Sequence, residues 1–210
     1  MTGAETSTSE FGRGGRLPRS ARRKQLLAAA QQVFVANGYH AAAMDDIAER
    51  AGVSKPVLYQ HFPGKLELYL ALLDTQAETL ARVVQAALDA TDDNRQRIHG
   101  VLSAYFGFVD RHDHDGAFRL IFETDLGNEP AVRERVEAVA EKTMRAVAET
   151  VAGDTGLDTA RAELLSTALT GAAQVAARWW LDQDRPVTQE EAVFLLESLL
   201  WRGISNFPRQ

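Results

Sequence analysis

The chain contains no cysteine. Disulfide bonds, thiolate metal sites and cysteine nucleophiles are therefore excluded, and the composition suits a reducing compartment. The chain also lacks any run of about 18 consecutive apolar residues, which a membrane-spanning helix requires. Its first 15 residues contain no apolar stretch of the kind found in secretory signals. We therefore expect a soluble, cytoplasmic protein with no membrane partner.

Positive charge is scarce in the chain as a whole, whose formal net charge is −6. Such an average argues against a general nucleic-acid-binding protein. The charge is unevenly distributed, however. Residues 11–65 carry nine Lys or Arg against three Asp or Glu, a net charge of +6, whereas residues 66–210 carry 14 against 24, a net charge of −10. The charge needed to meet DNA phosphates is thus confined to the N-terminal part.

No segment alternates polar and apolar residues over the length of a strand, so nothing predicts a β-sheet. Apolar residues instead recur at helical spacing between polar breaks. The predicted helices are 19–37, 44–51, 55–62, 65–90, 96–112, 117–124, 129–152, 158–181 and 188–206. We expect an all-α fold of about nine helices. In it, 1–18 form a flexible basic arm, 19–66 a three-helix helix-turn-helix domain, and 67–210 a helical bundle for ligand binding and dimerisation.

The segment 44–69 has the mechanical features of a helix-turn-helix. Gly52 can take the positive φ that the tight turn requires. Ser54 is a good N-cap for the second short helix, and Pro56 in its first turn gives up only an amide hydrogen that has no partner there. A purely structural helical hairpin is the alternative, and the combined pattern favours DNA binding.

The outward face of that second helix is short and uncharged, as expected for a helix that enters a major groove. Val57 can contact a thymine methyl group and Gln60 can pair with adenine, whereas Tyr59, His61 and Lys65 lie where phosphates would run. The predicted DNA contacts are Ser54, Lys55, Pro56, Val57, Tyr59, Gln60, His61 and Lys65. The arginines at 13, 16, 19, 22 and 23 either enter a minor groove or belong to a solvated tail.

These residues also carry a family resemblance. Phe34, Gly38 and Tyr39, followed by IAERAGVSKPVLYQHFPGK at 47–65 and a long helix, resemble the DNA-binding domain of the TetR family over about residues 20–80. The resemblance implies a homodimer whose two recognition helices enter successive major grooves of double-stranded operator DNA. It also implies a variable C-terminal domain that binds a small-molecule effector.

The chain departs from the family pattern at Ala42 and Ala43, where the family usually has Thr or Ser. The resemblance therefore implies that a helix cap and a phosphate contact are missing at this point.

The C-terminal part offers candidate residues for two further roles. Aromatic and polar side chains either line a ligand cavity or belong to the ordinary core and surface; they are Tyr105, Phe106, Phe108, Phe118, Phe122, Thr170 and Gln174. Excess apolar surface on the last two helices predicts a four-helix dimer interface. Its candidate residues are Leu165, Ala168, Ala172, Val175, Trp179, Leu196, Leu199 and Leu200.

Catalytic and metal chemistry find no support. The run His112–Asp115 has metal-capable side chains but no third distant ligand, so we interpret it as a solvated loop. No nucleophile stands at a legible spacing from a base, there is no glycine-rich phosphate loop, and no cofactor is expected. Our hypothesis is a repressor released from its operator by a small, mostly apolar effector. A dimeric regulator or activator without an effector is the alternative, and an enzyme that has borrowed the DNA-binding module is a remote third.

Overall fold

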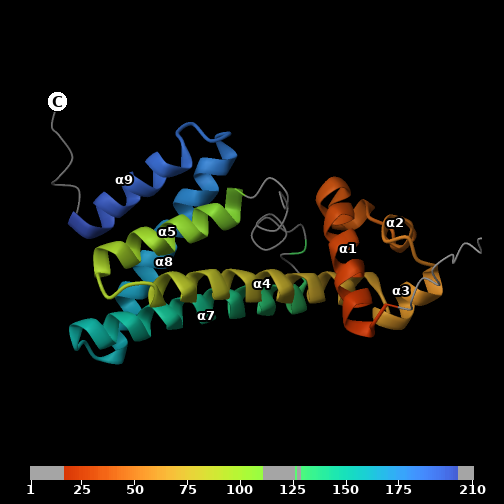
Figure 1. The fold of residues 1–210 in the computed structure, drawn as a ribbon, viewed down its shortest axis with the longest axis horizontal. Coiled ribbons are helices and arrows are strands. Elements are labelled where there is room, and N and C mark those ends of the chain that lie inside the picture. Colours follow the sequence, from red (N-terminus) through yellow and green to blue (C-terminus); the bar gives the residue numbers. More distant parts are fainter. Residues whose placement is uncertain (1–16, 111–125, 127–128, 203–210) are drawn as a thin grey trace, which may run out of the picture.

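The computed structural model describes residues 17–110, 126 and 129–202, and this part of the chain is entirely helical (Figure 1). The helices are α1 (Arg19–Ala41), α2 (Met44–Arg50), α3 (Lys55–His61), α4 (Lys65–Asp89), α5 (Asn94–Asp110), α7 (Pro130–Thr155), α8 (Thr159–Asp182) and α9 (Gln189–Arg202). The predicted all-α class is confirmed, and these eight helices match eight of the nine predicted segments. The ninth segment, 117–124, lies outside the described residues, as does the arm up to residue 16.

Helices α1 to α3 form a small unit at one end of the molecule (Figure 1). The predicted end of the first helix at Gly38 is a kink, where this residue takes a φ of 73° and a single further turn follows. Gly52 takes a φ of 64° in the turn between α2 and α3, as the sequence predicts. Ile47 of α2 and Leu58 of α3 are fully buried, which fixes the two short helices against α1 and against each other.

Helix α4 belongs to both parts of the molecule. Near its N-terminal end Tyr69 packs edge-on against Phe34 of α1, with ring centroids 5.2 Å apart. About two turns further on, Gln76 Nε2 donates a 2.9 Å hydrogen bond to the buried Gln31 Oε1 of α1. The C-terminal half of α4 then packs against α5 and α7 (Figure 1). The unit formed by α1 to α3 and the bundle are therefore connected by one continuous helix.

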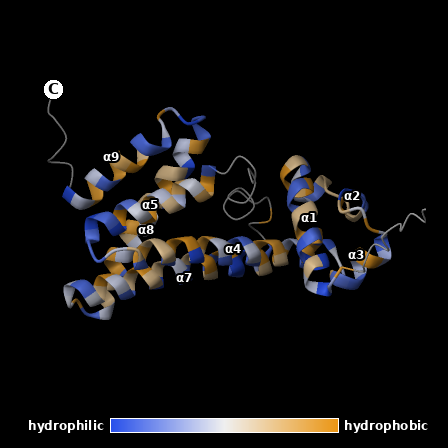
Figure 2. Cartoon of the chain, in the orientation of Figure 1, coloured by the Kyte–Doolittle hydropathy of each residue, from blue (hydrophilic) through white to orange (hydrophobic). Residues whose placement is uncertain are grey.

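The bundle is built from two layers on α4. Helix α7 packs on α4 and α8, whereas α5 packs on α4 and α9 (Figure 1). Hydrophobic residues line these contacts and also run along α9 (Figure 2). Among the described residues, no helix is long and apolar enough to cross a membrane.

A buried carboxylate joins α9 to α5. Glu197 accepts a 2.6 Å hydrogen bond from Arg95 Nε, and its other oxygen lies 2.9 Å from His99 Nδ1. Burial by itself raises the pKa of the Glu197 carboxyl, but the hydrogen bonds and charges of Arg95 and His99 outweigh it and hold the pKa below its ordinary value. The carboxylate therefore stays ionised, and the pairing fixes how α9 lies on α5.

Candidate DNA interface and ligand cavity

Helix α3 presents the predicted DNA-reading residues to solvent. Leu58 and the adjacent Phe62 are buried and anchor the helix. On its other side Tyr59 is 47% exposed, and Gln60 is exposed as well. The remaining predicted contacts on α3 and its N-cap are also accessible: Ser54, Lys55 and Pro56 are exposed, and Val57 and His61 are partly exposed. The arrangement leaves one face of α3 free for a groove.

A cluster of positive charge lies beside the C-terminal end of α3. Burial lowers the pKa of His61, and the nearby charges of Arg19, Arg23 and Arg22 lower it further. Arg23 also lies over the ring of Phe62, with its guanidinium carbon 4.4 Å from the ring centroid. The first turns of α1 thus add their charges to the surface of α3, which is the arrangement that phosphate binding needs.

Lys55 at the start of α3 is held by one exposed partner. Its ammonium lies 2.5 Å from Asp45 Oδ2, and both side chains are more than half exposed. The hydrogen bond and the charge of Asp45 raise the pKa of Lys55. An exposed pair of this kind contributes little to stability, so Lys55 can exchange Asp45 for a phosphate at low cost.

Lys65 has a different role from the phosphate contact predicted for it. Its ammonium donates to the carbonyl oxygens of Tyr39, His40 and Ala42 at 2.8, 3.2 and 2.9 Å. It also lies 4.5 Å from the centroid of the Tyr39 ring. Because an ammonium group has three donors, these carbonyls occupy all of them. We therefore correct the sequence-based assignment: Lys65 clamps the turn after Gly38 to the start of α4.

The helix caps of this unit are weak. Ala43 occupies the N-cap position of α2, where it has no side chain that could accept a hydrogen bond, and Ala42 beside it is buried. Ser54 stands at the N-cap of α3 as predicted, but its hydroxyl makes no capping hydrogen bond. Both helices are therefore held mainly by their buried side chains.

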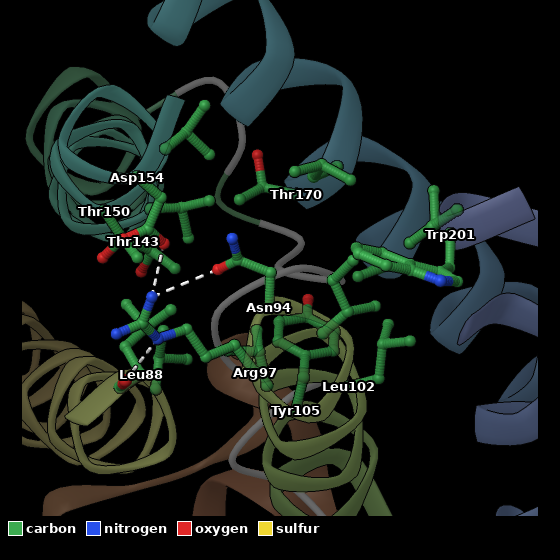
Figure 3. Close-up of a pocket in the computed structure, with 18 of the residues that line it drawn as sticks. Leu88, Asn94, Arg97, Leu102, Tyr105, Thr143, Thr150, Asp154, Thr170 and Trp201 are labelled. Atoms are coloured by element: carbon green, nitrogen blue, oxygen red, sulfur yellow. Dashed lines mark hydrogen bonds and ion pairs between the residues drawn. The ribbon is translucent and has the colours of Figure 1, made fainter. Parts of the chain in front are cut away.

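A cavity of about 220 Å³ lies inside the bundle, walled by the C-terminal end of α4 and by α5, α7, α8 and α9 (Figure 3). Most of its surface is apolar, and its lining includes Val84 and Leu88 of α4, Ile98 of α5, Val147 of α7 and Leu169 of α8. The helix that walls one part of the cavity, α4, is also the helix that contacts α1 near its other end.

The predicted lining residues divide into three groups. Tyr105, Thr170 and Gln174 line the cavity. Phe106 and Phe108 are buried in the core and are not among the lining residues, which corrects their assignment; Phe106 instead packs 5.5 Å from the ring of Trp180. Two further predicted residues, Phe118 and Phe122, lie outside the described residues.

The polar end of the cavity was not predicted from the sequence. Arg97 donates to the Leu88 carbonyl and to Asn94 Oδ1, each at 3.1 Å, and pairs with Asp154 of α7 (Figure 3). The group thereby ties the end of α4 to α5 and α7. Arg97 also lies 3.2 Å from Asp92 Oδ1, so its charge is met by two carboxylates of the protein.

Helices α8 and α9 leave apolar side chains uncovered. On α8 these recur every three or four residues, so they form one face; the large ones are Leu164, Leu165, Val175 and Trp179, with Ala168 and Ala172 between them. On α9 the exposed apolar residues are Phe194, Leu195, Leu199 and Trp201. Leu196 and Leu200 were also predicted to lie in the dimer interface. Both instead pack against the core, and Leu200 lines the cavity, which corrects their assignment.

Metal ligands do not gather in the part of the chain that the structure describes, where no three His, Asp or Glu side chains come together. The run His112–Asp115 lies outside it.

Two family models match the sequence. One, described as bacterial regulatory proteins of the tetR family, matches residues 26–72. The other, described as the tetracyclin repressor-like C-terminal domain, matches residues 94–203. Together they include α3, α5, α7, α8 and α9, whereas the cavity-lining residues of α4, Val84 and Leu88, lie between the two matched ranges.

Whole-length relatives give the same result. The HTH-type transcriptional activator FasR of Mycolicibacterium smegmatis is 48% identical over 196 residues, which are 93% of this chain and 89% of that protein. The crystal structure of a TetR-like transcriptional regulator from Rhodococcus sp. RHA1 is similar with a TM-score of 0.72 and 29% identity, over 91% of this chain and 100% of the other.

A third likeness concerns the fold alone. The transcriptional regulator FadR from Bacillus subtilis, crystallised in complex with stearoyl-CoA, has a TM-score of 0.71 at 18% identity, over 86% of this chain and 98% of the other. The helical order described above is thus shared well beyond close relatives.

Proposed function

Since the chain belongs to the TetR family and is a DNA-binding regulator of transcription rather than an enzyme, we propose that it binds its operator as a homodimer. We further propose that a small, mostly apolar ligand in the cavity lowers its affinity for that operator. The observation that carries the proposal is the placement of α4, which walls the cavity with Val84 and Leu88 and packs on α1 through Tyr69 and Gln76.

The DNA-binding part of the proposal rests on the exposed face of α3. Val57 and Gln60 read base edges, while Lys55, Tyr59 and His61 contact phosphates. Gln60→Ala should therefore change the preference between operators by about 1–3 kcal/mol at one base pair. Lys55→Met should weaken all sequences alike. Equal losses of Gln60→Ala on operator and on random DNA, measured by fluorescence anisotropy, would remove Gln60 from the readers.

The dimer rests on the uncovered apolar face of α8 and α9. Two helices from each subunit would bury side chains such as Val175 and Trp179, which are 72% and 57% exposed in the single chain. An uncovered apolar face of this kind favours a self-complementary two-fold interface. Such a pair would present two α3 helices to one face of the DNA, about 34–36 Å apart.

The ligand proposal predicts a reciprocal effect. If the ligand and the operator favour different orientations of α4, each must weaken the binding of the other by the same factor, about 5- to 150-fold. Stearoyl-CoA, present in the FadR structure, is a suitable first probe because the cavity is largely apolar. Calorimetry of this probe with and without operator tests the coupling. Tight binding with equal affinities would show that the ligand does not control DNA binding.

The direction of regulation has two candidates. The sequence analysis favours a repressor, whereas the relative from Mycolicibacterium smegmatis is named an activator. We favour activation for this reason, with the ligand withdrawing the activator from its site. Transcription in vitro from the operator-bearing promoter decides between them, since an activator raises the transcript level and the ligand then lowers it.

A further inference from the structure

Acidic side chains are rare in the N-terminal unit, and they gather in one helix. Residues 11–65 contain only three, Asp45, Asp46 and Glu49, and all of them belong to α2 and are exposed. Among the described residues, only Asp45 of these three pairs with a base. That base is Lys55 at the start of α3, whose Nζ lies 2.5 Å from Asp45 Oδ2. A carboxylate of α2 thus lies against one of the predicted DNA contacts.

Other bases of this unit have no carboxylate partner. Arg22 donates to a glutamine amide oxygen at 2.8 Å, and the guanidinium of Arg23 lies over the ring of Phe62. Within the described residues of 17–65, Lys55 is the only base that forms an ion pair with a carboxylate. The protein itself thus neutralises one of the charges that the proposed complex requires, and leaves those of Arg22 and Arg23 available.

A DNA phosphate would meet the same atom of Lys55. Carboxylate and phosphate oxygens are both anionic acceptors for an ammonium group, and both bind it at short distances. The side chains of Lys55 and Asp45 are more than half exposed, so a phosphate can reach the ammonium without the displacement of any buried group. Once it has done so, the carboxylate has lost its partner, and it repels the phosphate because two like charges lie close together. Both effects oppose DNA binding.

We propose that Asp45 is an intramolecular competitor of DNA: its carboxylate occupies the position on Lys55 that a backbone phosphate oxygen takes in the complex, and it thereby lowers the affinity for every DNA sequence. The inference rests on the phosphate contact that the proposed function gives to Lys55. Because the pair is exposed, its removal should raise the affinity of a dimer by about two- to thirtyfold. Binding through phosphates alone is thus kept weak, and occupancy of a site depends more on the base contacts of Val57 and Gln60.

The first test removes the charge of Asp45 and keeps its shape. Fluorescence anisotropy measures the binding of the full-length Asp45→Asn variant to a random-sequence duplex and to an operator-bearing duplex of the same length. Both should bind about two- to thirtyfold more tightly than they bind the wild type. Asp46→Asn is the matched control, because it removes the same charge from the next residue, which has no base partner among the described residues. Its gain should stay below about twofold.

A double variant shows whether the effect passes through Lys55. In a Lys55→Met background there is no ammonium for which carboxylate and phosphate can compete, so Asp45→Asn should add less than about twofold to the affinity there. An equal gain from Asp45→Asn in the two backgrounds would show a general effect of negative charge and would overturn the inference. A gain from Asp46→Asn as large as that from Asp45→Asn would overturn it as well.

The single variant Lys55→Met separates this inference from the proposed function. If Lys55→Met weakens the binding of both duplexes and Asp45→Asn gives no gain, the competitor role of Asp45 is overturned and the phosphate contact of Lys55 stands. If Lys55→Met leaves the binding of both duplexes unchanged, the phosphate contact itself is wrong, and the inference about Asp45 is overturned with it.

Discussion

Replacing Lys65 by methionine separates two roles that a lysine at this position can have. In the structure its ammonium binds three main-chain carbonyls in the turn after Gly38. Each hydrogen bond is worth about 0.5–1 kcal/mol at a partly exposed site, so the substitution should cost about 1.5–3 kcal/mol. For a chain of this size, the corresponding fall in melting temperature is about 3–12 °C.

The salt dependence of operator binding distinguishes a phosphate contact of Lys65 from a structural role. A lysine that neutralises a phosphate adds about 0.9 to the slope of log Kobs against log salt, or about 1.8 for the two subunits of a dimer. Lys65→Met should leave the slope nearly unchanged and lower the affinity by a similar factor at every salt concentration. Lys55→Met, the matched control, should reduce the slope by about 1.8 and leave the melting temperature within about 2 °C, because its partner Asp45 is exposed.

A Lys65→Met variant that loses about 1.8 from the slope while its melting temperature stays that of the wild type would contradict this role of Lys65. Such a result would mean that Lys65 leaves the carbonyls when DNA binds. Differential scanning fluorimetry and anisotropy titrations at several salt concentrations supply both quantities.

Three other predictions follow from the same structure. Operator affinity should rise as the pH falls from about 8 to about 6, because burial and the nearby arginines lower the pKa of His61 in the free protein and phosphates would raise it in the complex; in His61→Gln this rise, measured at constant ionic strength, should be much smaller. Val175→Arg should give monomers in sedimentation runs, since it places a charge in the proposed interface, whereas a dimer as stable as that of Gln85→Arg would exclude this face of α8. Ala43→Ser should add the missing cap of α2 and about 0.5–2 kcal/mol of stability; a melting temperature no higher than that of Ala36→Ser, an exposed position within α1, would contradict it.

Helices and turns were predictable because their signals are local. The breaks at Gly38 and Gly52 can be predicted from the residue type alone, and both glycines take the positive φ expected at such points. The exposed face of α3 was predictable for the same reason, since buried Leu58 and Phe62 fix its rotation. The spacing of apolar residues within this one short segment was enough to predict which face of α3 is exposed.

Long-range contacts were not predictable in this way. The acceptors of Lys65 are main-chain carbonyls 23 to 26 residues earlier in the chain, and a carbonyl has no signature in the sequence. In α9 apolar residues occur on nearly every side, so periodicity could not decide that Leu196 and Leu200 face inward while Leu195 and Leu199 face outward. The cavity likewise depends on how five separate helices meet, which no single segment encodes.

In the proposed regulation, the length of helix α4 would amplify a small rotation. Its 25 residues span about 37 Å at 1.5 Å per residue. A rotation of about 5° at the cavity end therefore moves the other end by about 3 Å, and two-fold symmetry would apply this displacement at both half-sites in opposite directions. DNA half-sites have a fixed separation, so a small angular change is enough to spoil the fit. If the proposed coupling transmits only this angle from one end of α4 to the other, we expect mutations in the cavity to change which molecule is bound without altering which DNA sequence is recognised.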